Sequence, residues 1–166
     1  MLYILAIILC IAADQAVKWY VTANLALYEQ APLLPGIVEL YHIQNTGGGF
    51  SILAGHTWVL TVLTAILMAG IAAALVKKWF HHPLAMWMLT LILGGGLGNL
   101  IDRVRLGYVV DMFHFQFIRY PVFNVADIFV VCGTIGFAAY YILIHDKIAE
   151  KKEEDAHESS GDPGGS

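Results

Sequence analysis

The chain has 166 residues, of which 58% are hydrophobic and only 13% are charged, and its mean hydropathy is +0.68. Soluble domains carry about 25% charged residues, so this composition argues against a soluble protein and predicts an integral membrane protein. The formal charge of −4 arises in an acidic C-terminal tail, and no basic surface of the kind that binds nucleic acid is indicated.

Four apolar segments are long enough to cross a membrane as helices, which takes about 20 residues. The first lacks the basic start of a signal peptide and continues past Cys10, so we expect an uncleaved helix. The four predicted spans are Leu2 to about Val21, Thr57 to about Val76, Pro83 to about Ile101 and Phe123 to about Ile144.

An even number of spans places both ends of the chain on one side of the membrane. Five lysines flank the spans on that side, at 77, 78, 147, 151 and 152, against four bases on the other side, Lys18, Arg103, Arg105 and Arg119. The positive-inside rule therefore predicts cytoplasmic termini. The polar residues 147–166 are predicted to form a disordered cytoplasmic tail.

Two long polar connections fall on the opposite, outer side, at about residues 22–56 and 102–122. Within the first, "GIVELYHIQN" alternates well enough to predict a strand pair or an extended segment lying on the membrane. It is followed by "NTGGGFS", whose three glycines permit backbone conformations closed to other residues.

Ionisable and amide residues gather near the outer ends of the spans, where they are costly and by default mark a functional site. Asp14 and Lys18 are four residues apart on a predicted helix, so they share a face and can pair. The other members of this cluster are Asn45, Asn99, Asp102, Arg103, Asp111, Asn124 and Asp127.

Purely structural roles stay open for several of these residues. Asp14 and Lys18 could form a buried ion pair that only fixes helix packing. Asp102 and Arg103 could be a helix-end pair with an arginine that reaches the interface. The asparagines at 99 and 124 could hydrogen-bond between helices.

Asp111 and Asp127 are harder to assign to packing, because neither has a basic residue at helical spacing. Two carboxylates that face one another in a low-dielectric site share a proton, since one pKa rises. The ionised member can draw a proton from water and the protonated member can hydrogen-bond a carbonyl, as in aspartic proteases. We expect no base beside the pair, and we expect Asn124 to orient a carboxylate or the substrate backbone.

Other functions fit these residues less well than a catalytic pair. Carboxylates in spans can carry protons or cations, but transporter sites lie near the midplane rather than at one face. A Ser–Lys pair would need Ser51 with Lys18, and a lysine four residues from Asp14 is better explained as a charged partner. No cysteine or histidine pair has zinc spacing, so neither a metal nor a cofactor is expected.

The motifs resemble those of the lipoprotein signal peptidases, the bacterial signal peptidase II family, up to about Asp146. They are "DQAVK" from Asp14, "NTGGGFS" from Asn45, "GGGLGNLIDR" from Gly94, "GYVVDMF" from Gly107 and "PVFNVAD" from Pro121. The resemblance implies an all-α membrane protein with four transmembrane helices, a small extracytoplasmic β-cradle and an outer helix over the site. Residues 1–146 would form the peptidase domain.

The resemblance also implies roles. Asp111 and Asp127 would be the catalytic pair of an aspartic endopeptidase without a cofactor. The residues that would bind substrate or support the site are Asp14, Lys18, Asn45, Asn99, Asp102, Arg103 and Asn124.

The partners implied are membrane lipids and prolipoproteins whose cysteine carries diacylglycerol, cut just before that cysteine. The expected setting is a monomer in the bacterial cytoplasmic (inner) membrane, with its site near the outer face. Gly48 and Gly49 stand where the family commonly has alanines, and Ile128 stands where it often has a small or polar residue. These departures predict a floppier loop beside an unchanged carboxylate pair.

Overall fold

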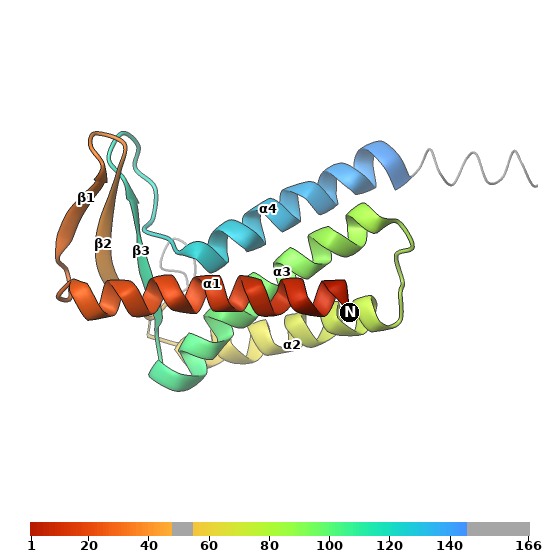
Figure 1. Ribbon diagram of the computed structural model, residues 1–166. Coiled ribbons are helices and arrows are strands. Elements are labelled where there is room, and N and C mark those ends of the chain that lie inside the picture. Colours follow the sequence, from red (N-terminus) through yellow and green to blue (C-terminus); the bar gives the residue numbers. More distant parts are fainter. Residues whose placement is uncertain (48–54, 146–166) are drawn as a thin grey trace, which may run out of the picture.

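The computed structural model describes residues 1–47 and 55–145. Figure 1 shows long helices that run roughly alongside one another, with a small sheet at one end. The expectations for Gly48, Gly49 and Ser51 and for the tail at 147–166 lie outside the described residues.

The four predicted spans correspond to four helices, each long and apolar enough to cross a membrane. The second span is predicted to the residue, while the first helix extends to Asn24 and the fourth begins after Asn124. The helices are α1 (Leu2–Asn24), α2 (Thr57–Val76), α3 (Pro83–Leu106) and α4 (Val125–Tyr140), the last continued by the π-helix η2 (Tyr141–His145).

Helix α3 ends at Leu106 and not near Ile101, so it is longer than the sequence predicted. Asp102 and Arg103 were expected at the end of the span, but both lie within the helix. Arg103 and Arg105 occupy its last turn, where cations interact favourably with the helix dipole. The helix stops at Gly107, whose φ of 81° is left-handed and suits glycine.

The sheet has three antiparallel strands in the order β1-β2-β3. The alternating segment predicted as a strand pair or an extended segment is one central strand, paired on both sides. The strands are β1 (Gln30–Leu34), β2 (Val38–Asn45) and β3 (Val109–Phe115). The outer helix implied by the resemblance is not among the described elements.

The register of β2 against β3 places two sequence-distant residues at one corner of the sheet. Ile43 lies opposite Asp111, and Asn45 lies opposite Val109. Asn45 is therefore next to Asp111 on the same corner, although 66 residues separate them.

Helix α3 lies at the centre of the bundle, and three successive glycines let the other helices approach it. Successive helical residues turn by about 100°. As a result Gly94 faces α1, Gly95 faces α4 and Gly96 faces α2. A Cβ atom on Gly95 would collide with the Ala126 carbonyl oxygen, which belongs to the first turn of α4. The first turn of α4 can therefore lie this close to α3 only because residue 95 is a glycine.

We expect Gly95→Ala to lower the free energy of unfolding by about 1–3 kcal/mol, the usual cost of overpacking. The matched control is Gly70→Ala in α2, where an added Cβ meets nothing within 4 Å. Alanine there should stabilise the helix by about 0.5–1 kcal/mol. Thermal unfolding in detergent micelles measures both, and equal midpoints for the two variants would contradict this account of α3 packing.

Candidate active site

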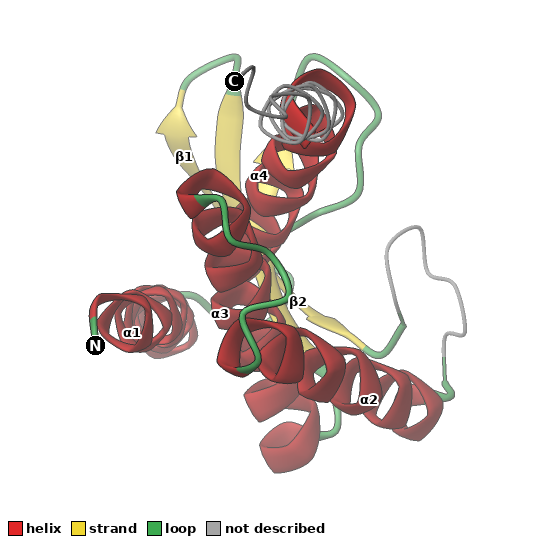
Figure 2. Ribbon diagram, turned by 90° about the vertical axis from the view of Figure 1, so that its right-hand side faces the viewer, coloured by secondary structure: helices red, strands yellow, loops and turns green. Residues whose placement is uncertain are grey.

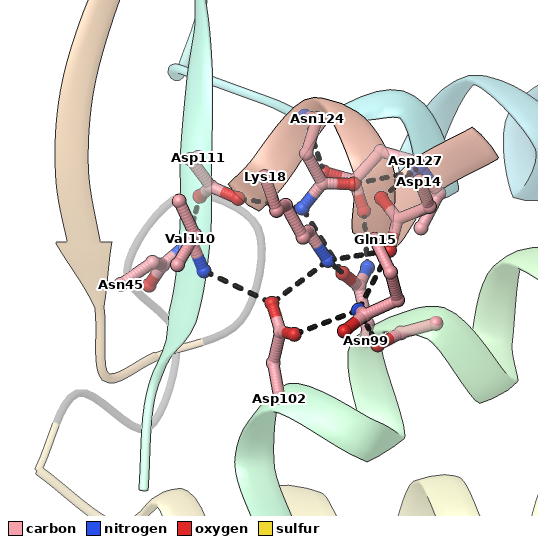
Figure 3. Close-up of polar contacts among 12 residues, drawn as sticks. Asp14, Gln15, Lys18, Asn45, Asn99, Asp102, Val110, Asp111, Asn124 and Asp127 are labelled. Carbon is pink, nitrogen blue, oxygen red and sulfur yellow. Dashed lines mark hydrogen bonds and ion pairs between the residues drawn. The ribbon is translucent and has the colours of Figure 1, made fainter. Parts of the chain in front are cut away.

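The polar cluster predicted from the sequence lies at the sheet end of the bundle. A cavity of about 470 Å³ opens there between β2, β3 and the start of α4. Asp111 and Asp127 both line this cavity, together with Asn45, Asn99 and Arg103. Figure 3 shows Asp111 on its strand, with Asn124 and Asp127 at the start of α4.

Asp111 projects from β3 and is 2% exposed. Each of its carboxylate oxygens accepts a hydrogen bond from an amide side chain. Asn124 Nδ2 donates to Oδ1 at 2.7 Å, and Asn45 Nδ2 donates to Oδ2 at 2.8 Å. The carboxylate is therefore held from both β2 and the start of α4.

Asp127 lies in the first turn of α4, three residues after the N-cap residue Asn124. The two residues form a capping box. The Asn124 side chain accepts from the Asp127 backbone N–H at 2.9 Å, and the Asn124 backbone N–H donates to Asp127 Oδ2 at 3.2 Å. Asn99 Nδ2 donates to the other oxygen at 2.8 Å. Asn124 thus contacts both carboxylates.

Hydrogen-bond donors fix the side-chain amide orientation of the three asparagines at 45, 99 and 124, because each Oδ1 atom accepts a hydrogen bond within the protein. Asn45 Oδ1 accepts from the Gly47 backbone N–H at 2.9 Å, and Asn124 Oδ1 accepts from the Asp127 N–H. Asn99 Oδ1 accepts from Lys18 Nζ at 2.9 Å and from Asn124 Nδ2 at 3.0 Å. Because each oxygen faces a donor, each NH₂ group must face a carboxylate.

Lys18 uses all three of its ammonium protons within the protein. Its Nζ lies 2.8 Å from Asp14 Oδ2, 2.8 Å from Asp102 Oδ2 and 2.9 Å from Asn99 Oδ1. The side chain is 4% exposed. The Asp14–Lys18 pair suggested by helical spacing is therefore present. Asp102 pairs with Lys18 rather than with Arg103, because neighbouring helical residues point about 100° apart.

The two carboxylates bound to Lys18 also hold backbone groups next to Asp111 and Asp127. Asp14 Oδ1 accepts from the N–H of Ala126 at 2.9 Å, and Ala126 directly precedes Asp127. Asp102 Oδ2 accepts from the N–H of Val110 at 3.2 Å, and Val110 directly precedes Asp111. One buried ion cluster thereby fixes the main chain beside both cavity carboxylates.

Gln15 belongs to this cluster and was missed from the sequence. Its Nε2 donates to Asp102 Oδ1 at 2.9 Å and to Asp14 Oδ2 at 3.2 Å. It thereby links α1 to α3 a second time. The available signal was an uncharged polar side chain in an otherwise apolar span, which commonly marks a hydrogen bond between helices.

Burial, and to a smaller extent the nearby charge of Asp127, raise the pKa of Asp111 to about 7. The hydrogen bonds from Asn45 and Asn124 and the charge of Lys18 act against this rise. The repulsion expected between two acids in one low-dielectric site is therefore present. Asp111 holds a proton well above the pH at which an exposed aspartate loses it.

The expectation that no base lies beside the carboxylates is wrong. Lys18 acts electrostatically on Asp111, and Arg103 lines the cavity and interacts with both acids. Sequence spacing could not reveal this, since Lys18 comes from α1 and Arg103 from α3. The Arg103 Nε is buried and has no hydrogen-bond partner among the described residues.

All nine residues predicted for the site lie together. Eight are joined by the hydrogen bonds and ion pairs above, and Arg103 lies on the cavity wall. No group of three His, Cys, Asp or Glu side chains suited to a metal occurs within 1–47 and 55–145.

Comparison with known proteins extends this description to a family. The sequence model for signal peptidase II matches residues 6–143. Lipoprotein signal peptidases of Streptococcus pyogenes serotypes M5, M18 and M1 are each 42% identical to this chain over 137 residues. The matches cover 81% of this chain and 88% of each relative.

Two solved structures described as bacterial membrane enzymes, determined by the in meso method, share the fold. The first has a TM-score of 0.79 and covers 87% of this chain and 88% of its own. The second has a TM-score of 0.77 and covers 86% and 93%, respectively. Both are 24% identical to this chain, so they support the fold alone.

We expect Lys18→Met to lower the free energy of unfolding by about 3–5 kcal/mol, because it leaves the Asp14 and Asp102 carboxylates buried without a counter-charge. The control is Lys77→Met, an exposed lysine over the Trp79 ring, where the loss should stay near 0.5–1 kcal/mol. Adding Asp102→Asn to Lys18→Met should recover part of the loss. Equal unfolding midpoints for Lys18→Met and Lys77→Met in micelles would refute the role of the cluster.

Proposed function

The chain belongs to the signal peptidase II family, and we propose that Asp111 and Asp127 are the catalytic pair of this enzyme. It is an aspartic peptidase that removes signal peptides from prolipoproteins. It is also a multi-pass membrane protein of the bacterial type, with four apolar helices.

The observation that carries the assignment is that two buried carboxylates from different elements line one cavity. A single asparagine, Asn124, donates to both. The raised pKa of Asp111 supports a pair that holds one shared proton near neutral pH. Because the two groups titrate together, that proton belongs to the pair rather than to one aspartate.

In the proposed reaction, the ionised carboxylate takes a proton from a water molecule held between the pair. The water oxygen then attacks the carbonyl carbon of the scissile bond, while the protonated carboxyl donates to the carbonyl oxygen. The tetrahedral intermediate collapses, and the proton first taken from water goes to the leaving amine. The asparagine donors fix both carboxylates in advance, so little reorganisation accompanies the reaction.

The expected substrate is a prolipoprotein with a diacylglyceryl-cysteine, cut before that cysteine. The cavity walls support entry from the membrane, since they include Val130 and Val131 of the spanning helix α4. Such a substrate is held in the bilayer by its lipid and by the apolar part of its signal peptide. It can therefore approach the carboxylates sideways from the bilayer, and the proposed enzyme acts as a monomer.

The proposed orientation places both termini in the cytoplasm and the cavity near the outer face. Trp19, Tyr20 and Trp58 are exposed at the sheet end of the bundle, at 71%, 55% and 71%. Exposed tryptophan and tyrosine side chains favour the membrane–water interface. On α1, Lys18 directly precedes Trp19, and Asp14 lies five residues, or more than one turn, further inside, which supports a cavity close to the headgroups.

We expect Asp111→Asn and Asp127→Asn each to abolish cleavage of a lipidated prolipoprotein, seen as loss of the mobility shift on a gel. Each amide keeps the shape of the side chain but cannot carry the shared proton. Glu29→Gln, which changes an exposed carboxylate outside the cavity, serves as the control and should cleave normally. Cleavage at the normal rate by either aspartate variant, with unchanged thermal unfolding, would rule out the pair.

We expect kcat/KM to fall above about pH 7 by about tenfold per pH unit. The sign follows from the raised pKa of Asp111: the shared proton is retained below about pH 7 and lost above it. A pair without this proton cannot donate to the carbonyl oxygen. Cleavage rates of reconstituted enzyme across the neutral range test this, and a flat profile up to about pH 9 would contradict it.

A further inference from the structure

The end of the sheet farthest from α1 carries large apolar side chains that no described element covers. We call this surface the apolar tip. Its residues and exposed fractions are Leu33 (48%), Leu34 (54%), Ile37 (51%), Phe117 (62%) and Ile118 (47%).

The tip is one surface because its two pieces are hydrogen-bonded together. The Gln116 backbone N–H donates to the Ile37 carbonyl oxygen at 3.0 Å. The Gly36 N–H donates to Gln116 Oε1 at 2.9 Å. The turn after β1 and the loop after β3 therefore present their apolar side chains at the same place.

The sheet projects from the bundle toward the side on which α4 lies, as both Figure 1 and Figure 2 show. The tip thus overhangs the flank of a helix that is long and apolar enough to cross the membrane. Helix α4 exposes Ile128, Val131 and Ile135 at 42%, 46% and 65%. Lipid that covers α4 is therefore continuous with the region beneath the tip.

The charges around the tip fit a lipid surface. The charged residue next to the tip is Arg119, which is exposed and directly follows Ile118. An arginine in this position can lay its stem along acyl chains and reach lipid phosphates. The nearest acid on the sheet, Glu39, is occupied by His114 Nδ1 at 2.8 Å and Gln116 Nε2 at 2.9 Å.

An aromatic cluster connects the tip to the cavity. The ring of Phe115 lies 5.4 Å from the ring of Phe117 in the tip, and 5.9 Å and 5.1 Å from those of Tyr120 and Phe123. Tyr120 and Phe123 line the cavity. The rings therefore form a continuous line of contacts from the tip to the cavity.

We propose that the apolar tip is a second membrane contact, which inserts shallowly into the lipid beside α4 and holds the cavity mouth at the lipid surface. The occupant is bilayer lipid, since the tip continues the lipid-facing surface of α4. Large exposed apolar patches on proteins usually mark such interaction sites. This contact does not depend on which residues carry the catalysis.

The test is a nitroxide label at Phe117→Cys, in protein that also carries Cys132→Ala and is reconstituted in phosphatidylcholine–phosphatidylglycerol vesicles. Cys10 is buried, whereas Cys132 is exposed on α4, so the labelled wild-type protein gives the lipid-exposed reference. A label at Glu29→Cys, at the other end of β1, gives the water-exposed reference. Leu34→Cys provides a second position in the tip.

The measured quantity is the relaxation enhancement by oxygen, which enriches in lipid, relative to that by a water-soluble nickel chelate. We expect the labels at 117 and 34 to shift from the Glu29 value toward the Cys132 value. If both tip labels collide with the nickel chelate as readily as the label at 29, in protein that unfolds at the normal temperature, the proposed insertion is wrong.

Discussion

The Lys18 ammonium is the interaction on which the rest of the site depends. It joins Asp14 on its own helix to Asp102 and Asn99 on α3. The remaining oxygens of the two acids hold the N–H groups of the residues that directly precede Asp127 and Asp111. A single charge in α1 therefore sets the positions of two carboxylates that come from a helix and a strand.

A buried ion cluster of this kind is a poor source of stability, because desolvation of the charges offsets most of their attraction. Its value here is geometric. Lys18 faces Asn99 Oδ1, which turns the Asn99 NH₂ group toward Asp127. An apolar residue at 18 would leave Asn124 Nδ2 as the single donor among the described residues that holds Asn99 Oδ1 in this orientation. A flipped amide would point an oxygen at the carboxylate and repel it.

The sequence was sufficient for the spans and for the membership of the site, but not for its pairings. Apolar length predicted four helices, and the cost of polar groups in a membrane singled out the nine residues. Which residue meets which depended on relations that spacing does not contain. The register of β2 against β3 brings Asn45 to Asp111. The close packing of α1 on α3, which glycine allows, brings Lys18 to Asp102. For the same reason the bases near the pair were overlooked.

A membrane setting also bears on the proton that the proposed chemistry needs. Burial is the largest cause of the raised pKa of Asp111, so bulk water in the cavity would lower that pKa and remove the shared proton. With the proposed placement, the cavity mouth opens toward lipid between the apolar tip and α4, where it would admit a lipid-anchored chain and limit the entry of water. The same feature that selects a membrane-bound substrate would then keep the carboxylate pair in its reactive protonation state.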